Sequence, residues 1–257
     1  MPLTANQSRC VSEILSSGFG NLPAAFGKQE TDSLISKFES AFSSSDKKFE
    51  SSDPKDWTRD QNGKVYAANR VDEFIKDFNE IWQRPELTDF IRLILGSGFG
   101  LVQADYFDKR SERTRSFPWH RDITITVKEN DLPSEDFVKP TFRAGIPQVE
   151  APIQLLEKML TLRIYLDPPT VDDEALVVKP NTHLVGEMEF DDDQVINSNV
   201  GDAFVMRPLL FRSTRSSKTA TKTYSRVIHL KFAGQQDLWD KFEWRTFVPC
   251  PQEDERH

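Results

Sequence analysis

The segment "FPWHRDITITV", residues 117–127, sets the interpretation of the rest of the chain. Apolar and polar residues alternate along it, which is typical of a β-strand with one buried face. Successive side chains of a strand point to opposite faces, so His120 and Asp122 share one side and the isoleucines after them take the other. An imidazole and a carboxylate on one face are two of the three ligands that hold iron(II) in many oxygenases. A hydrogen-bonded surface pair is the alternative interpretation.

More alternating segments follow in the second half of the chain. They are short, rich in β-branched and aromatic residues, and bounded by Pro, Gly, Asp and Asn; they cover residues 101–108, 159–167, 175–180, 203–211 and 223–233. This spacing predicts a sandwich or barrel, with an insertion at 129–157 as a loop that forms a lid over one end.

The first third shows apolar residues at helical spacing. Three helices are predicted, at residues 30–42, 70–82 and 85–96, with a loop rich in Ser, Asp and Lys between the first two. We therefore expect a mainly β fold with flanking α-helices. The chain is predicted to form a single domain (1–257), in which a mostly helical N-terminal part (1–99) packs on a β-rich core (100–248).

The composition limits which binding partners and which cellular location we expect. The 257 residues carry a formal net charge of −8, with acidic clusters at 191–193 and 253–255, which argues against nucleic acid or an anionic membrane surface as a partner. Cys10 and Cys250 lack metal-site or disulfide spacing, which favours a reducing, cytoplasmic location. We expect neither a signal peptide nor a membrane-spanning run of about 18 apolar residues. The sequence does not indicate an oligomeric state.

The last predicted strand carries Arg226 within an apolar pattern. One face holds Arg226 with Tyr224, Ile228, Leu230 and Phe232; the opposite face holds Ser225, Val227, His229 and Lys231. If the apolar face is the inner one, Arg226 points into the core and His229 points outward. A buried guanidinium requires an anion, which is either a carboxylate of the chain or the far carboxylate of a small diacid such as 2-oxoglutarate.

Four segments in order carry a family resemblance. They are "FPWHRDITITVKE", "LEKMLTLRIYLDPP", "ALVVKPNTHLVG" and "GDAFVMRPLLFRSTRSS...SRVIHLKFAG". Over roughly residues 100–234 the chain resembles the phytanoyl-CoA dioxygenase family of iron(II)- and 2-oxoglutarate-dependent oxygenases. The resemblance implies a double-stranded β-helix, which is a cupin-like jelly-roll, flanked by N-terminal helices.

The resemblance also implies a site and a reaction. His120 and Asp122 match the first two metal ligands at the catalytic centre, and Arg226 matches the arginine that binds 2-oxoglutarate. Lys109 lies in a segment that in the family is beside the co-substrate, although a solvated basic loop is an equal alternative. The implied protein is an oxidoreductase that uses Fe(II) and 2-oxoglutarate to hydroxylate a small organic substrate, with release of succinate and carbon dioxide.

One position departs from the family pattern. Where the family has its distal metal-binding histidine, shortly after Pro-Leu-Leu, this chain has Arg212. A guanidinium has no lone pair to give to a metal ion. Another histidine could substitute: His183 is a weak candidate because the family uses it structurally, His229 is predicted to point outward, and His257 is terminal. A shifted register in the basic loop after Phe211 is a further alternative.

Two other functions remain open. In the first, the barrel has lost iron and binds an anionic ligand between Arg212 and Arg226, as a binding or regulatory protein. In the second, His120 and Asp122 act as an acid/base pair in a metal-independent isomerase or lyase. An ion pair between Asp122 and Arg212 favours the first function, and an open pocket with a free His120 favours the second.

Overall fold

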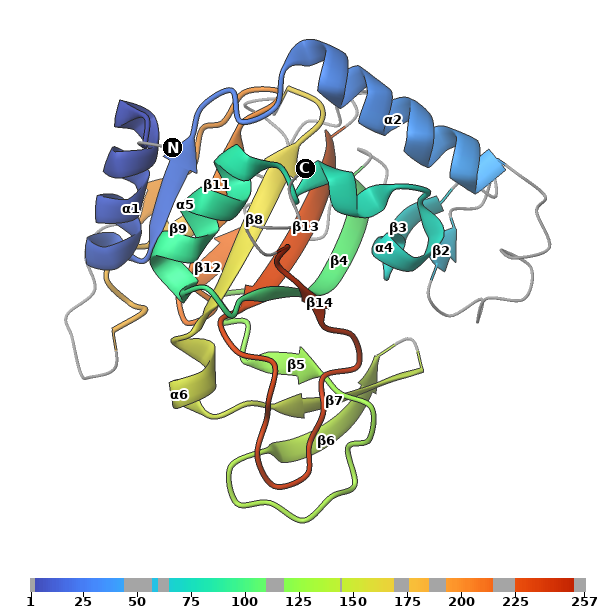
Figure 1. Cartoon of the computed structure of the whole chain (residues 1–257), viewed down its shortest axis with the longest axis vertical. Helices are drawn as coiled ribbons and strands as arrows, with labels where there is room; N and C mark the ends of the chain where they lie inside the picture. Colours follow the sequence, from blue (N-terminus) through green and yellow to red (C-terminus); the bar gives the residue numbers. More distant parts are fainter. Residues whose placement is uncertain are drawn as a thin grey trace.

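The computed structural model describes residues 3–43, 57–59, 65–109, 118–143, 145–168, 176–184, 193–214 and 225–251. The fold is mainly antiparallel β with helices on one side (Figure 1). The helices are α1 (Ala5–Ser17), α2 (Lys28–Ser43), α4 (Val71–Phe74), the 3-10 helix η2 (Phe78–Ile81), α5 (Pro85–Leu95) and α6 (Ile153–Leu156). The strands are β1 (Phe19–Leu22), β2 (Trp57–Arg59), β3 (Val65–Asn69), β4 (Gly100–Lys109), β5 (Thr124–Thr126), β6 (Val138–Arg143), β7 (Ile146–Glu150), β8 (Met159–Tyr165), β9 (Leu176–Lys179), β10 (Gln194–Val195), β11 (Ala203–Met206), β12 (Phe211–Thr214), β13 (Ser225–Ala233) and β14 (Val248–Pro249).

Two of the three predicted helices are confirmed. They are α2 and α5, and α5 has proline at its first position and ends at Gly96, whose φ is 86°. The predicted helix at 70–82 is wrong in its middle, because an extended Ile75 separates α4 from η2. Helix α1 was not predicted; it begins with a capping box in which Thr4 and Gln7 bond each other's backbone N–H groups.

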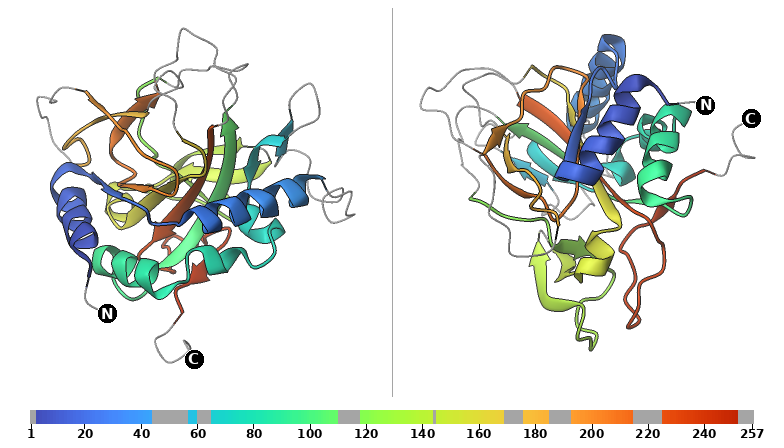
Figure 2. Two further views of the ribbon diagram at one scale, coloured as in Figure 1. Left: turned by 90° about the horizontal axis from the view of Figure 1, so that it is seen from above. Right: turned by 90° about the vertical axis from the view of Figure 1, so that its left-hand side faces the viewer.

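The large sheet has the order β1-β11-β8-β13-β4-β3-β2, and β14 also pairs with β4. Strands β1, β2 and β3 precede residue 100, so the N-terminal part contributes strands to the same sheet as the β-rich core. Helices α1, α2 and α5 lie over one face of this sheet (Figures 1 and 2).

The apolar side chains of β13 face these helices. Phe232 packs edge-on against Trp82, with ring centroids 5.4 Å apart, and Ile228 and Leu230 belong to the same buried cluster. On the neighbouring strand, Tyr106 stacks on Phe38 of α2 at 4.7 Å. Alternation therefore turns Val227, His229 and Lys231 toward the opposite face of the sheet.

Two three-stranded sheets lie against that opposite face. One has the order β10-β9-β12 and the other β5-β7-β6. Each buries an apolar cluster on the large sheet: Val178 of β9 packs with Val227, and Val149 of β7 packs with Val102 and Ala233. Charged side chains occupy the space between these clusters. The predicted loop at 129–157 is thus largely wrong, because the insertion forms β6, β7 and α6.

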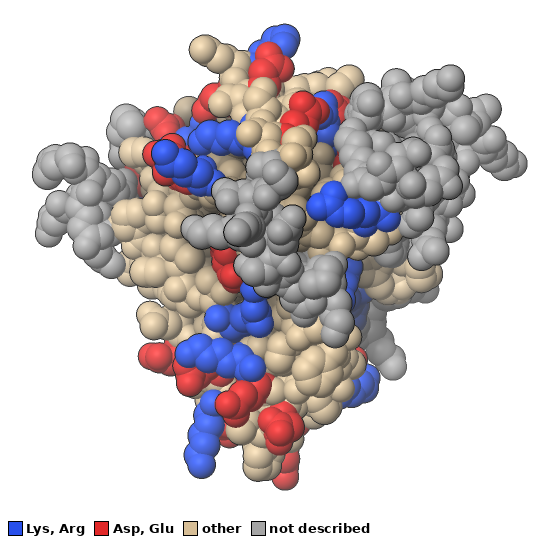
Figure 3. All heavy atoms as spheres, turned by 90° about the vertical axis from the view of Figure 1, so that its right-hand side faces the viewer, with Lys and Arg blue, Asp and Glu red and all other residues tan. Residues whose placement is uncertain are grey.

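The described surface adds two observations on partners. None of the described helices is long and apolar enough to cross a membrane. Over the lower part of the face in Figure 3, Lys and Arg side chains lie beside Asp and Glu side chains, so neither sign of charge dominates there.

Candidate functional site

Backbone pairing brings His120 and Arg212 together. The two residues form an antiparallel bridge, in which the N–H of His120 donates to the carbonyl of Arg212 at 2.9 Å and the reverse bond is 3.0 Å. The N–H of Asp122 donates to the carbonyl of Pro208 at 2.9 Å. The segment that carries the histidine and the aspartate is therefore fixed beside the segment that carries Arg212.

The side chains of His120 and Asp122 line the same cavity. His120 Nε2 lies 3.9 Å from Asp122 Oδ1. His120 Nδ1 is 2.8 Å from the carbonyl oxygen of Pro118. Since a carbonyl only accepts, Nδ1 is the donor in this contact. The shared face that the sequence predicts for the pair is present in the structure.

Arg212 reaches into this site and forms an ion pair with Asp122. Its Nη2 atom lies 2.5 Å from Asp122 Oδ2, and the two side chains are only 12% and 18% exposed. Burial alone would raise the pKa of Asp122, but the positive charges of Arg212 and Lys231 outweigh it and hold the pKa below its usual range. Asp122 is thus an ionised carboxylate whose partner is a guanidinium.

These residues do not fit an iron ion. The facial triad requires three side chains with lone pairs, and the side chain that pairs with Asp122 here is the permanently protonated Arg212. Arg212 also engages Oδ2, one of the two carboxylate oxygens of Asp122. Within the described part of the chain, no three His, Cys, Asp or Glu residues are grouped so that they could hold a metal ion.

Arg226 lies on the apolar face of β13, as the alternation predicts, but not at the site of His120 and Asp122. Its Nε and Nη2 atoms donate to the two carboxylate oxygens of Asp167 at 2.7 and 2.8 Å, and Nη1 donates to Glu39 of α2 at 2.8 Å. Arg226 therefore lies on the helix-covered side of the sheet, away from His120 and Asp122. Its anion is a carboxylate of the chain, which is one of the two alternatives that the sequence left open. The match to a 2-oxoglutarate-binding arginine is not seen, because both faces of β13 are buried and the more polar one lines the cavity.

The predicted outward position of His229 is wrong for the same reason. His229 is 9% exposed and lines the cavity with His120 and Asp122. Its Nε2 atom lies 3.1 Å from Arg163 Nη1, and because arginine only donates, Nε2 is the acceptor. Burial and the neighbouring charges of Arg163 and Arg212 hold the pKa of His229 well below its usual value. His229 is a neutral ring that accepts from Arg163.

His183 does not join this site. His183 packs over Gly18 at the end of α1, so closely that a Cβ atom on that glycine would lie 2.5 Å from its Nδ1 atom. It lines a separate pocket with Arg207. Lys109 is the last residue of β4, and its side chain lies outside the described residues, as does His257.

Several cavity residues were not predicted. Arg163 of β8, His229 of β13 and Asp105 of β4 are in register across three adjacent strands, so they form one row on the inner face. Lys231 begins the next row, opposite Gln103. In each of these strands, polar or charged residues alternate with apolar ones. This pattern was the signal in the sequence that could have revealed them.

The cavity is strongly basic. Its volume is about 430 Å³. Its described lining includes five Lys or Arg side chains but two Asp side chains: Arg121, Arg143, Arg163, Arg212 and Lys231 against Asp105 and Asp122. The ion pair of Arg212 with Asp122 removes one charge of each sign. Positive charge remains on the wall opposite that ion pair.

No family model and no curated protein matches the chain. Solved structures do match in fold. The carbocyclase SnoK of nogalamycin biosynthesis, a non-haem α-ketoglutarate-dependent enzyme, has a TM-score of 0.63 at 13% identity, over 92% of this chain and 88% of that one. The epimerase SnoN, with Fe³⁺, α-ketoglutarate and a nogalamycin compound, has a TM-score of 0.62 at 11% identity, over 97% of each chain.

EctD from S. alaskensis, with 2-oxoglutarate and 5-hydroxyectoine, has a TM-score of 0.64 at 14% identity, over 90% of this chain and 76% of that one. This chain has the fold of iron- and 2-oxoglutarate-dependent enzymes.

Proposed function

We propose that this protein binds a small organic anion in the cavity of an oxygenase-type barrel, without iron. We assign the three sheets to the double-stranded β-helix that the resemblance to the phytanoyl-CoA dioxygenase family implies. Hydroxylation by a member of that family would need a third metal ligand, and the described residues offer Arg212 in its place.

Arg163 carries the proposal. Its residue exposure is 4%, and it forms no ion pair with any described residue. Its contacts are the neutral ring of His229 and the face of Tyr165, whose centroid is 5.1 Å away. A buried guanidinium without a counter-charge is costly, so an anionic ligand in the cavity would stabilise it.

Lys231 strengthens the anionic preference. It lines the same cavity one row further along β13 and forms no ion pair within the described residues. A carboxylate between Arg163 and Lys231 would face two cations, and a planar guanidinium binds a carboxylate through two parallel hydrogen bonds. Because Asp122 is already paired with Arg212, the acid/base role suggested for it in a metal-independent enzyme has less support.

Calorimetry with a panel of small anions tests the proposal. Succinate, 2-oxoglutarate, butyrate and 4-aminobutyrate are titrated into the metal-free protein. At least one should bind, and Arg163→Gln should weaken that binding by about tenfold or more, since a charge-assisted pair is lost. Arg226→Gln is the matched control, because Arg226 is a buried arginine on the other face of the same sheet. Equal affinity in both variants, or no binding by any probe, would overturn the proposal.

A further inference from the structure

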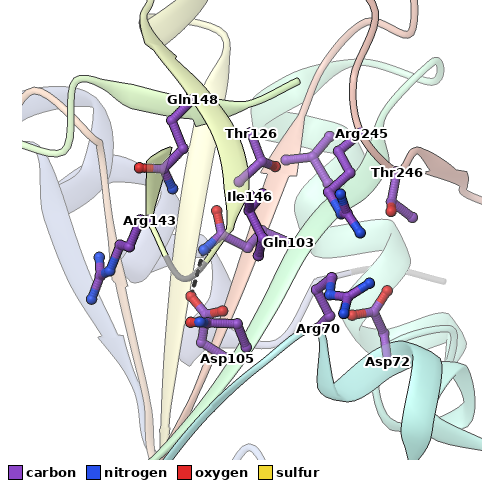
Figure 4. Close-up of a pocket in the computed structure, with 12 residues that line it drawn as sticks. Arg70, Asp72, Gln103, Asp105, Thr126, Arg143, Ile146, Gln148, Arg245 and Thr246 are labelled. Carbon is purple, nitrogen blue, oxygen red and sulfur yellow. Dashed lines mark hydrogen bonds between the residues drawn. The ribbon is translucent and has the colours of Figure 1, made fainter. Parts of the chain in front are cut away.

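The cavity continues into a recess the size of a water molecule. The recess has a volume of about 20 Å³, and Gln103, Asp105, Arg143 and Gln148 line both spaces. Figure 4 shows Asp105 beside Gln103, with Arg143 and Gln148 around them. A polar space of this size accommodates one water-sized group, such as a hydroxyl or an amino group.

Asp105 has a carboxylate oxygen with no donor in reach. The residue is 4% exposed, and its Oδ2 atom accepts from Gln103 Nε2 at 2.6 Å. Oδ1 is buried and has no hydrogen-bond partner among the described residues. A buried acceptor without a donor is unfavourable, and burial raises the pKa of this carboxyl. The recess therefore favours a group that donates a hydrogen bond.

The cations of the cavity do not supply that donor. Lys231 and Arg143 form no ion pair with Asp105, and Arg163 donates to His229, which stands between it and Asp105 in the row. Two strand spacings separate Arg163 from Asp105, or about 10 Å between their Cα atoms. A ligand with several carbon atoms would thus meet Arg163 at one end. At the other end it would meet the acceptor Oδ1 of Asp105, with Lys231 and Arg143 in the same part of the cavity.

We propose that the cavity binds a carboxylic acid whose far end carries a hydrogen-bond donor, an amino or hydroxyl group, which Asp105 accepts while Arg163 holds the carboxylate. This inference rests on the proposed anion-binding function and specifies its ligand class. Asp105 acts against dicarboxylates, because a second carboxylate would bring another acceptor, and no donor, to the unpartnered Oδ1 atom.

Matched ligands that differ only at the far end test this inference. The four-carbon set is butyrate, 4-hydroxybutyrate, 4-aminobutyrate and succinate; the six-carbon set is hexanoate, 6-hydroxyhexanoate, 6-aminohexanoate and adipate. In the wild-type protein, we expect at least one donor-ended member to bind about tenfold more tightly than the plain acid of its length, and the dicarboxylate to bind most weakly. If only the amino acid of a set is preferred, the site selects a cationic far end. If the amino acid and the hydroxy acid are both preferred, the site selects any far end that donates a hydrogen bond.

Asp105→Asn makes the test specific to Asp105. An amide oxygen can still accept from Gln103, while its NH₂ group places a donor where Oδ1 stood, so the order should reverse in favour of the dicarboxylate. Asp108→Asn is the control: it is the same change in the same strand, on the opposite face, and it should leave the order unchanged. Affinity ratios within each variant are compared, which separates selectivity from any loss of stability.

The outcomes separate the two proposals. If anions bind in an Arg163-dependent way but the far end makes no difference, or the dicarboxylate binds best to the wild-type protein, the inference about Asp105 is wrong and the anion-binding function stands. If no member of either set binds and 2-oxoglutarate does not bind either, the proposed function itself fails. If the Asp105→Asn variant does not fold, the ranking of ligand affinities in the wild-type protein alone tests the inference.

Discussion

Arg212 holds Asp122 through a 2.5 Å contact between Nη2 and Oδ2, and the backbone of Arg212 is bonded in both directions to that of His120. The guanidinium is therefore placed by strand pairing beside the histidine and aspartate that resemble two metal ligands. In this position it supplies the positive charge that a metal ion would otherwise bring to Asp122. A cation brought to the other carboxylate oxygen, which faces His120, would also meet the positive charge of Arg212.

The first prediction concerns metal binding at this position. Wild-type protein should show no rise in melting temperature with Fe(II) under anaerobic conditions, and no visible charge-transfer band when 2-oxoglutarate is added. Arg212→His should give both, because it adds an imidazole on the face of His120 and Asp122. Arg212→Gln, which removes the charge without adding a good ligand, should give neither. Metal binding by the wild-type protein would contradict the assignment of Arg212.

The second prediction concerns acid stability. The pKa of Asp122 is lower in the folded protein than its unfolded value of about 3.9, so its contribution is complete above that pH and is lost as the pH falls through the folded pKa. Asp122→Asn should lower the free energy of unfolding at pH 7 by about 3 kcal/mol, because it leaves Arg212 buried without a counter-charge. The difference from wild type should shrink below about pH 4. Urea unfolding between pH 2 and 7 measures it; a constant difference would argue against the ion pair.

The third prediction concerns His229 in a higher pH window. Its pKa is depressed in the folded state, so below about pH 6.5 the unfolded chain takes up a proton that the folded one does not, and stability falls with pH. The slope reaches about 1.4 kcal/mol per pH unit for one such group. His229→Gln can still accept from Arg163 but does not titrate, so its stability should change less than wild type between pH 6.5 and 4.5. Parallel curves would mean that His229 is protonated in the fold.

Much of the fold followed from local pattern, and the face assignment did not. Helix α5 was predictable because a proline at its start, an apolar stripe and Gly96 at its end all indicate a helix. Strand β8 was predictable because apolar and polar residues alternate along a segment that turn residues bound on both sides. The residues that line the cavity were not predicted. The rule that apolar residues face inward cannot decide between the two faces of a sheet when both are buried. The rule placed Arg226 correctly on the apolar face, but that face packs on helices, and His229 on the opposite face lines the cavity instead of facing outward.

The site was predictable only where a local motif carried it. His120 and Asp122 are two residues apart, so one strand is enough to place them together. Arg163, His229 and Asp105 come from three strands, and their row depends on the register of β4, β13 and β8. That register is set by long-range pairing, which a single sequence does not reveal.

The last prediction tests the corrected position of Arg226. Arg226→Gln should lower the free energy of unfolding by about 3 kcal/mol, since it leaves Asp167 in a site where both side chains are only 12% exposed. The affinity for the small anions should stay within about twofold of wild type, because Arg226 lies on the helix-covered face. In a double-mutant cycle with Asp167→Asn, the two changes should be strongly non-additive in stability and without effect on binding. A tenfold loss of anion affinity in Arg226→Gln would instead restore the assignment made from the family resemblance.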